Sequence, residues 1–438
     1  MKQNKQTILS VYAKYVSFQV LGMIGLSCYI LADTFFIARG LGTKGLTALN
    51  LAIPVFSFIS GFGLMIGMGG ATRYSIVKAE KDEKAGNIIF SQSVMYALIA
   101  AAAFVLVGIF FAEPISILLG ADVSTKGNTS VYLRVILIFA PLFLINHVLL
   151  CFVRNDGAPK LAMTGMIVGS FSNIVLDYIF IFPLKLGMFG AALATGLAPA
   201  ISLLILSTYF RKKKNRFWWI YIVPKIKSIA DISLLGVSSL IAEVSAGIVI
   251  ILFNMIILRL EGNIGVAAYG IVANLSLVAT ALFTGIAQGI QPIISHAYGK
   301  GELTERKKTY EYAIITGVIA SVCIYFIVWG FAEPIAAIFS KEQNEKLIGI
   351  AVTGLRLYFT AFLFLSINVI TVALFNSSDK PKEAFTLSLL RGFVFIVPIV
   401  LIFAKVGGMT GVWLAFPITE LLTMILSLGI LMNKKLLK

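Results

Sequence analysis

The sequence predicts an all-α integral membrane protein in which twelve transmembrane helices form two six-helix lobes related by a pseudo-twofold axis. Three observations lead to this fold class. The 438 residues are 59% hydrophobic and 13% charged, and their mean hydropathy is +0.94, whereas soluble domains are about 25% charged. The chain contains twelve apolar stretches that reach the roughly 20 residues needed to cross a bilayer. Its two halves also repeat short motifs at a constant offset.

The expected spans are helices, because Gly, Ala and Ser occur throughout the apolar stretches and no alternating pattern typical of barrel strands is present. In chain order they lie near residues 10–38, 46–77, 88–112, 129–153, 161–182, 189–210, 230–258, 264–297, 310–332, 348–375, 384–403 and 410–432.

The charge distribution sets the expected orientation. With a cytoplasmic amino terminus, most of the 36 Lys and Arg residues fall in cytoplasmic segments, as the positive-inside rule requires. We therefore expect a multi-pass protein of a bacterial inner or plasma membrane with both termini cytoplasmic, and no nucleic-acid partner despite the net charge of +16. The basic run RKKKNR, from Arg211 to Arg216, is expected to fix topology and contact anionic lipids.

The repeat divides the chain into an N-terminal lobe (1–210), a cytoplasmic basic linker (211–229) and a C-terminal lobe (230–438). FAEPI at 111–115 recurs at 331–335, and GMFGAALA at 187–194 corresponds to GMTGVWLA at 408–415. Because each repeat holds an even number of spans, both start on the same face of the membrane. Such an arrangement favours a monomeric transporter that alternates access between two lobes.

Four acids lie well inside expected spans, namely Asp33, Asp177, Glu243 and Glu420. Each one needs a reason, since a carboxylate at mid-bilayer costs about 2.5 to 3.5 kcal/mol even on the lenient insertion scale. Glu113 and Glu333 are expected at the interface. Four arginines lie inside spans or at their edges: Arg73, Arg134, Arg356 and Arg391.

Three helices of the first lobe bring polar groups to one level. Counting helix rise from the expected outer boundaries puts Asp33, Asp177 and Thr195 roughly 8 to 9 Å deep. Asn173 precedes Asp177 by one turn and shares its helix face. Such an oxygen-rich set suits a shared H⁺ or a hard monovalent cation such as Na⁺, and a satisfied structural cluster is the alternative.

The corresponding positions of the second lobe carry no such set. They read Phe253, Val394 or Phe395, Pro398 or Ile399, and Phe416. Because the second lobe folds without these polar groups, their presence in the first favours ion coupling over a purely structural need.

At these residues the sequence resembles the multidrug and toxic compound extrusion (MATE) family over essentially its whole length. The resemblance is carried by DTFFIARGLG at 33–42, NIVLDYIFIF at 173–182, GMFGAALAT at 187–195 and GIAQGIQPIISHAYG at 285–299. It implies a secondary antiporter that exports amphipathic, mostly cationic drugs in exchange for inward H⁺ or Na⁺, without a cofactor. By motif, the cation site implied by the resemblance falls on Asp33, Asn173, Asp177 and Thr195.

Further residues are candidates for weaker roles. Glu243 corresponds to an acid that some family members place on the seventh helix, and with Asn368 and Tyr178 it is a candidate substrate-binding residue. Pro54 and Pro292 interrupt spans 2 and 8 and are candidate gating kinks.

The main alternative function is a flippase for a lipid-linked saccharide or another amphipathic lipid precursor. It would need intramembrane Arg and Lys to hold a pyrophosphate, whereas the intramembrane charges are mostly acids. A channel would leave the duplication unexplained. An enzyme is disfavoured because no nucleophile and base stand at motif spacing.

Overall fold

The computed structural model describes residues 7–339 and 344–433, and within these residues it consists of helices and connecting turns without a strand. The helices are α1 (Ile8–Ala79), α2 (Glu83–Leu118), α3 (Lys126–Ile138), α4 (Ala140–Asn155), α5 (Pro159–Ile181), α6 (Gly187–Arg211), α7 (Ile226–Gly299), α8 (Leu303–Gly330), α9 (Ala332–Phe339), α10 (Glu345–Tyr358), the 3₁₀ turn η1 (Phe359–Ala361), α11 (Phe362–Ser377), α12 (Pro381–Leu389), the π-helix η2 (Leu390–Phe395) and α13 (Ile396–Asn433).

The described part of the chain accounts for all twelve predicted spans. Eight of its helical segments are long and apolar enough to cross a membrane, and α3 with α4, bent by 48°, makes a ninth. Three of these segments are too long for one crossing: α1 with 72 residues, α7 with 74 and the segment Pro381–Asn433 with 53. Each is broken at a glycine with positive φ, at Gly42 (64°), Gly262 (63°) and Gly408 (54°). Division at these glycines gives twelve spans.

The positive-φ glycines of the backbone recur at the same offset as the repeated sequence motifs. Gly42 and Gly262 are 220 residues apart and have nearly the same φ. Gly187 (62°) corresponds in the same way to Gly408. A left-handed conformation is costly for residues with a Cβ atom, so its recurrence at matching positions marks the same turn built twice.

Residue contacts divide the chain into two compact units, which we describe separately. The N-terminal unit comprises 17–244 and 295–301, and the C-terminal unit comprises 1–16, 245–294 and 302–438. These limits follow packing and differ from those of the predicted repeats: the start of α1 packs with the C-terminal unit, and the start of α7 with the N-terminal unit. The predicted lobes 1–210 and 230–438 stay a prediction.

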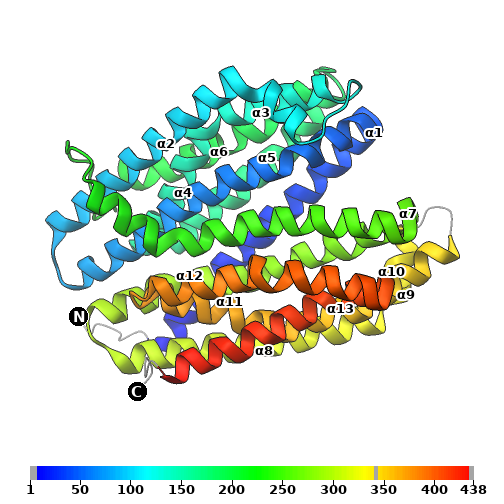
Figure 1. The fold of residues 1–438 in the computed structure, drawn as a ribbon. Coiled ribbons are helices and arrows are strands. Elements are labelled where there is room, and N and C mark those ends of the chain that lie inside the picture. The colour runs from blue at the N-terminus through cyan, green and yellow to red at the C-terminus, as the bar shows by residue number, and fades with distance from the viewer. Residues whose placement is uncertain (1–6, 340–343, 434–438) are drawn as a thin grey trace. The chain divides into compact units, whose positions relative to one another are not determined.

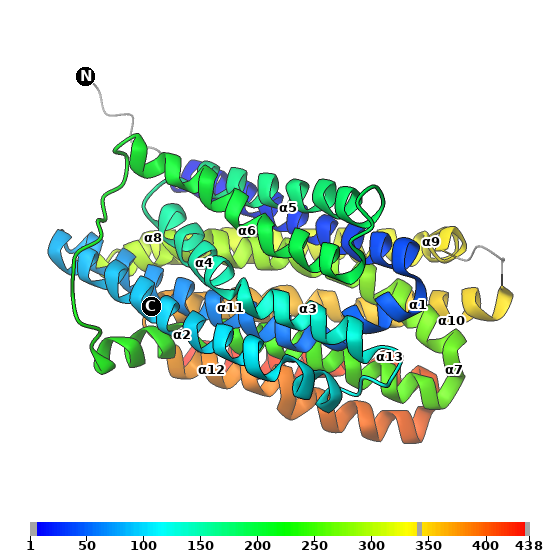
Figure 2. The ribbon, with the colours of Figure 1, turned by 90° about the horizontal axis from the view of Figure 1, so that it is seen from above.

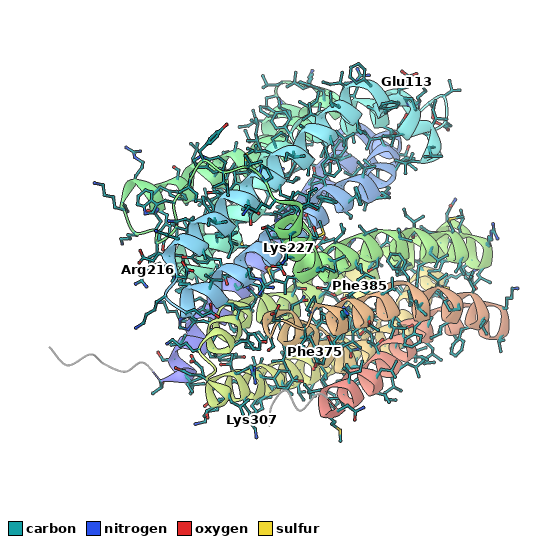
Figure 3. The ribbon with its side chains drawn as sticks, turned by 60° about the vertical axis from the view of Figure 1, so that its left-hand side comes forward. Glu113, Arg216, Lys227, Lys307, Phe375 and Phe385 are labelled. Atoms are coloured by element: carbon teal, nitrogen blue, oxygen red, sulfur yellow. The ribbon has the colours of Figure 1, made fainter. Side chains whose placement is uncertain are left out.

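The N-terminal unit is a bundle in which α5 and α6 pack along their lengths (Figures 1 and 2). Glu113, near the end of α2, lies at the opposite end of the bundle from Arg216 in the basic linker (Figure 3). This separation fits the predicted topology, in which the linker lies on one face of the membrane and Glu113 near the other.

The linker between α6 and α7 is docked onto the N-terminal unit. Phe217 is fully buried, and its ring centroid lies 4.5 Å from that of Phe90. The backbone N–H of Arg216 donates to Asp156 Oδ2 over 2.8 Å, and that of Trp218 donates to Asn87 Oδ1 over 2.7 Å. The sequence predicted only a basic connection here, whereas the structure attaches it through backbone hydrogen bonds and a buried aromatic ring.

The C-terminal unit contains a buried aromatic cluster. Phe253 is stacked on Tyr269 with centroids 5.5 Å apart, and Tyr358 is stacked on Phe416 at 4.7 Å. Trp413 is fully buried and contacts the rings of both tyrosines. Aromatic packing therefore occupies the positions that correspond, through the repeat, to Asp33 and Thr195.

Candidate functional site

The four polar residues predicted to share one level come together inside the N-terminal unit. Asp33 lies on α1, Asn173 and Asp177 on α5, and Thr195 on α6. All four are buried, with Asn173 and Asp177 completely inaccessible. A site assembled from one bundle does not depend on how the two units are placed.

Asn173 links α5 to α6 at the centre of this cluster. Its amide satisfies both neighbours when the nitrogen faces Asp177: Nδ2 then donates to Asp177 Oδ2 over 3.0 Å, and Oδ1 accepts from the backbone N–H of Thr195 over 3.2 Å. The Thr195 hydroxyl donates to the Ala191 carbonyl over 3.1 Å. The amide thereby fixes the Asp177 carboxylate and the α6 backbone relative to each other.

Small residues allow α5 and α6 to approach closely enough for these contacts. A Cβ atom built on Gly169 of α5 would lie 3.3 Å from the Ala198 carbonyl oxygen of α6. Ala191, Ala192 and Ala194 are fully buried along the facing side. The sequence GAALAT thus supplies a narrow helix surface on which Asn173 and Asp177 can reach Thr195.

The two carboxylates face each other without a full set of donors. The Asp33 and Asp177 side chains are close enough to interact with each other. One oxygen of each, Asp33 Oδ1 and Asp177 Oδ1, is buried and has no hydrogen-bond partner. Because buried acceptors are normally satisfied and like charges repel, this pair calls for a proton or a cation between its oxygens.

The donor set of this cluster is made of oxygen atoms. Carboxylate, amide and hydroxyl oxygens are ligands of hard cations. Within the described residues no three His, Cys, Asp or Glu side chains are grouped so as to hold a metal ion.

Two tyrosines belong to this cluster and were missed by sequence reasoning. Tyr132 of α3 is buried, and its hydroxyl lies near the side chain of Thr195. Tyr29 precedes Asp33 by one helical turn and is close enough to both aspartates to interact with them electrostatically. The spacing of Tyr29 was a usable signal, since residues four apart share a helix face. No comparable signal exists for Tyr132, because nothing in the sequence fixes the rotation of α3.

The three candidate substrate-binding residues have different surroundings, and their place in a substrate site stays a prediction. Tyr178 is 54% exposed, and its ring packs 5.5 Å from that of Phe182, away from the buried Asp177. Glu243 is half-buried on α7, and a Cβ atom built on Gly61 of α1 would lie 3.1 Å from its Cβ. Asn368 belongs to the C-terminal unit and donates to Glu420 over 2.8 Å.

The candidate kinks do not coincide with the helix breaks. Pro54 lies inside α1 and Pro292 inside α7. The non-helical residue is Gly42 in α1 and Gly262 in α7. Backbone reversal is therefore achieved by glycine, and a role of the two prolines in gating stays a prediction.

Comparisons with known proteins agree with this architecture. Two relatives are named multidrug export protein MepA: one from Staphylococcus saprophyticus is 28% identical over 416 residues, covering 94% of this chain and 91% of the relative. The other, from Staphylococcus aureus strain MRSA252, is 27% identical over 400 residues, covering 90% and 86%.

Solved structures share the fold. An outward-facing MATE transporter of the MOP superfamily superposes with a TM-score of 0.91 at 23% identity, covering 99% of this chain and 97% of that one. A MOP superfamily transporter from Pyrococcus furiosus superposes with a TM-score of 0.90 at 23% identity, covering 99% and 98%. The family model described as MatE matches residues 4–179 and 239–402. The chain therefore belongs to the MatE family, the MATE transporters, and is a multi-pass membrane transporter and not an enzyme.

Proposed function

We propose that this protein is a secondary antiporter that exports amphipathic, mostly cationic compounds in exchange for inward H⁺ or Na⁺, with Asp33, Asn173, Asp177 and Thr195 as the coupling site. The observation that carries the proposal is the pair of unpartnered carboxylate oxygens, Asp33 Oδ1 and Asp177 Oδ1. Multidrug export is the printed function of the two staphylococcal relatives.

The pair is suited to bind and release one positive charge. An arrangement that leaves two buried acceptors unsatisfied is costly, and a bound H⁺ or Na⁺ removes that cost. Buried waters could satisfy the same oxygens without transport, but then replacing either aspartate by asparagine would leave ion coupling intact. The proposed site thus requires the negative charges of Asp33 and Asp177, and replacing either aspartate by asparagine tests this requirement.

One coupled charge supplies enough energy for export. At a membrane potential of about 150 mV, an inward monovalent cation releases roughly 3.5 kcal/mol. That free energy supports about a 300-fold concentration gradient of a neutral solute. A single site per transport cycle is therefore sufficient for a neutral solute. One-for-one exchange with a monovalent cationic compound moves no net charge, and it is then driven by the concentration gradient of the coupling ion.

Reconstitution in lipid vesicles tests the proposal. Ethidium efflux from the vesicle lumen is followed by fluorescence under an inward pH gradient, an inward Na⁺ gradient, or neither. We expect one gradient to accelerate efflux by the wild type, and Asp33→Asn and Asp177→Asn each to reduce efflux to the rate without a gradient. Full gradient-driven efflux by both variants would show that the aspartates are not the coupling site.

Glu113→Gln is the matched control. Glu113 is also a carboxylate of the N-terminal unit, but it is exposed and pairs with Lys126 over 2.5 Å. Its replacement should leave gradient-driven efflux unchanged. If the wild type moved a polyprenyl pyrophosphate across the vesicle membrane but no ethidium, the flippase alternative would replace the proposed drug export.

A further inference from the structure

The C-terminal unit contains a buried ion pair that the proposed coupling site does not use. Arg391 lies in the π-helix η2 and Glu420 in α13, and Arg391 Nε donates to Glu420 Oε1 over 2.5 Å. The Glu420 side chain is completely buried, whereas that of Arg391 keeps 24% of its surface exposed.

Two further side chains hold Glu420 in place. Asn368 Nδ2 donates to Glu420 Oε2 and to the Glu420 backbone carbonyl, each over 2.8 Å. The hydroxyl of Ser427 donates to Asn368 Oδ1 over 3.2 Å. Both carboxylate oxygens thus accept from fixed protein donors, and Glu420 serves to orient the guanidinium and is not a further ion-coupling acid.

One edge of the guanidinium remains available. Among the described residues, no hydrogen bond to Nη1 or Nη2 of Arg391 accompanies the one that Nε makes. Arginine presents its donors in a planar fork suited to bidentate binding of a carboxylate or phosphate. Because Glu420 binds Nε alone, the two-nitrogen edge of that fork is free.

The depth of Arg391 makes a free edge costly unless it has a function. Arg391 lies ten residues after Pro381, where α12 begins, and this places it about 15 Å from that end of a hydrocarbon core about 30 Å thick. A charged group at that depth avoids lipid and faces a protein partner or a water-filled cavity. Arg356, by contrast, pairs with Glu333 and stacks over the ring of Trp329.

The local backbone is also unusual. Leu390–Phe395 form a π-helix, a rare conformation that is frequent at functional sites. The wider turn changes the direction in which Arg391 leaves the helix relative to α12. The position of the Arg391 guanidinium is therefore set by an irregular backbone segment.

A flat apolar surface lies beside the ion pair. Phe416 precedes Glu420 by one turn and therefore shares its helix face. Its ring is only half-buried, and it stacks on Tyr358 with a centroid separation of 4.7 Å. Because Glu420 binds Arg391 and lies one turn from Phe416 on the same face of α13, a planar aromatic ligand that contacts Phe416 can direct an anionic substituent toward Arg391.

We propose that the Nη1 and Nη2 edge of Arg391, together with the ring of Phe416, is a binding subsite for the carboxylate of planar aromatic zwitterions. This inference rests on the proposed export of amphipathic compounds and names the residues that bind the anionic group of such a compound. It gives the C-terminal unit a polarity opposite to that of the acidic site formed by Asp33 and Asp177. Because Glu420 balances the charge of Arg391, selectivity comes from directional N–H bonds.

Binding of two matched fluorescent probes tests the subsite directly. Rhodamine 110 carries a free carboxylate, and rhodamine 123 is its methyl ester, so the two differ only in the group that Arg391 would bind. Fluorescence anisotropy with the purified full-length chain gives the dissociation constant of each probe. The Arg391→Gln, Glu420→Gln double variant removes both charges and leaves no charge buried without its partner.

We expect the double variant to bind rhodamine 110 about tenfold more weakly, as loss of a charge-assisted hydrogen bond implies, and rhodamine 123 almost unchanged. Arg391→Lys keeps the ion pair but commits its ammonium to Glu420, so it should weaken rhodamine 110 selectively as well. Arg356→Gln, an arginine of the same unit, should leave both affinities unchanged.

One result overturns the subsite: an unchanged ratio of the two affinities in Arg391→Lys and in the double variant. This holds whether both affinities stay as in the wild type or both fall by the same factor. Failure of the proposed export is recognised by a different measurement. In that case the wild type would move neither ethidium nor rhodamine 123 across the vesicle membrane, and this result does not depend on the ratio of the two binding affinities.

Discussion

Replacing Asp177 by asparagine should stabilise the folded protein while it abolishes coupling. Asp177 Oδ2 accepts from the Asn173 amide over 3.0 Å, but its other oxygen is buried and has no hydrogen-bond partner. An asparagine keeps an acceptor for Asn173 and offers an N–H to the unpartnered oxygen of Asp33. A buried unsatisfied acceptor costs about 1–3 kcal/mol, and so the substitution should raise the free energy of unfolding by an amount in that range.

Asp156→Asn is the matched comparison, because it changes another buried aspartate of the same unit in the same way. Asp156 accepts from Tyr74 over 2.7 Å and Tyr209 over 2.9 Å, and pairs with Lys78 over 2.5 Å. Here the carboxylate oxygens have hydrogen-bond donors, and the negative charge of the carboxylate is paired with Lys78. Breaking a buried pair costs about 3–5 kcal/mol, and the 20% exposure of Lys78 places the expected loss at the lower end.

Thermal unfolding in detergent, in Na⁺-free buffer near pH 8, measures both effects. Melting temperatures shift by about 2–4 °C per kcal/mol in chains of 150–250 residues, so a rise of a few degrees for Asp177→Asn and a fall for Asp156→Asn should be resolved. If Na⁺ is the coupling ion, added Na⁺ should stabilise the wild type by mass action and leave Asp177→Asn unchanged. A fall in melting temperature for Asp177→Asn comparable to that for Asp156→Asn would refute the reasoning.

Three other perturbations have distinct expected outcomes. Tyr132→Phe removes the hydroxyl that contacts the threonine of the site; we expect gradient-driven ethidium efflux to fall several-fold with little change in melting temperature, and unchanged efflux would remove Tyr132 from the site. Gly236→Ala should prevent the start of α7 from packing on α1, because the added Cβ would lie 1.8 Å from the Met65 carbonyl oxygen. We expect a lower yield of monodisperse protein for this variant. The control Gly270→Ala, whose Cβ meets no atom within 4 Å, should express normally. Hydrogen bonds within the loop before α3 lower the pKa of Asp122, so its stabilisation of that loop is present above the ordinary aspartate pKa and disappears as pH falls through the lowered value. The protection factors of the loop amides, which compare their exchange with the intrinsic rate at each pH, should fall over that acidic range, and pH-independent protection factors would contradict the assignment.

Most of the candidate site could be predicted from the sequence because helix geometry is regular. Asp33, Asp177 and Thr195 were placed at one depth by counting residues from span ends, and the structure brings them together with Asn173. The count worked because each residue advances a helix by a constant rise. Whether the four residues couple an ion is a prediction that the vesicle experiment tests.

Other contacts could not be predicted because they depend on how helices are rotated and where loops dock. Tyr132 reaches Thr195 only through the orientation of α3, and Phe217 is buried only because the basic linker lies against the N-terminal unit. The pairing of Arg391 with Glu420 joins two residues that the sequence marked separately. Their similar depth was a signal for this pairing. Nothing in the sequence indicated the π-helix that sets the direction of the Arg391 side chain.

The sequence by itself determined the membrane environment, the twelve spans, the duplication and the level of the polar residues, since these follow from hydropathy, helix rise and an offset between motifs. Only the tertiary structure decided which polar groups are satisfied. Asp156 receives donors from several segments, Glu420 receives them from Arg391 and Asn368, and Asp33 and Asp177 each keep an oxygen without a partner. That difference depends on side-chain packing between helices, which a one-dimensional pattern does not contain.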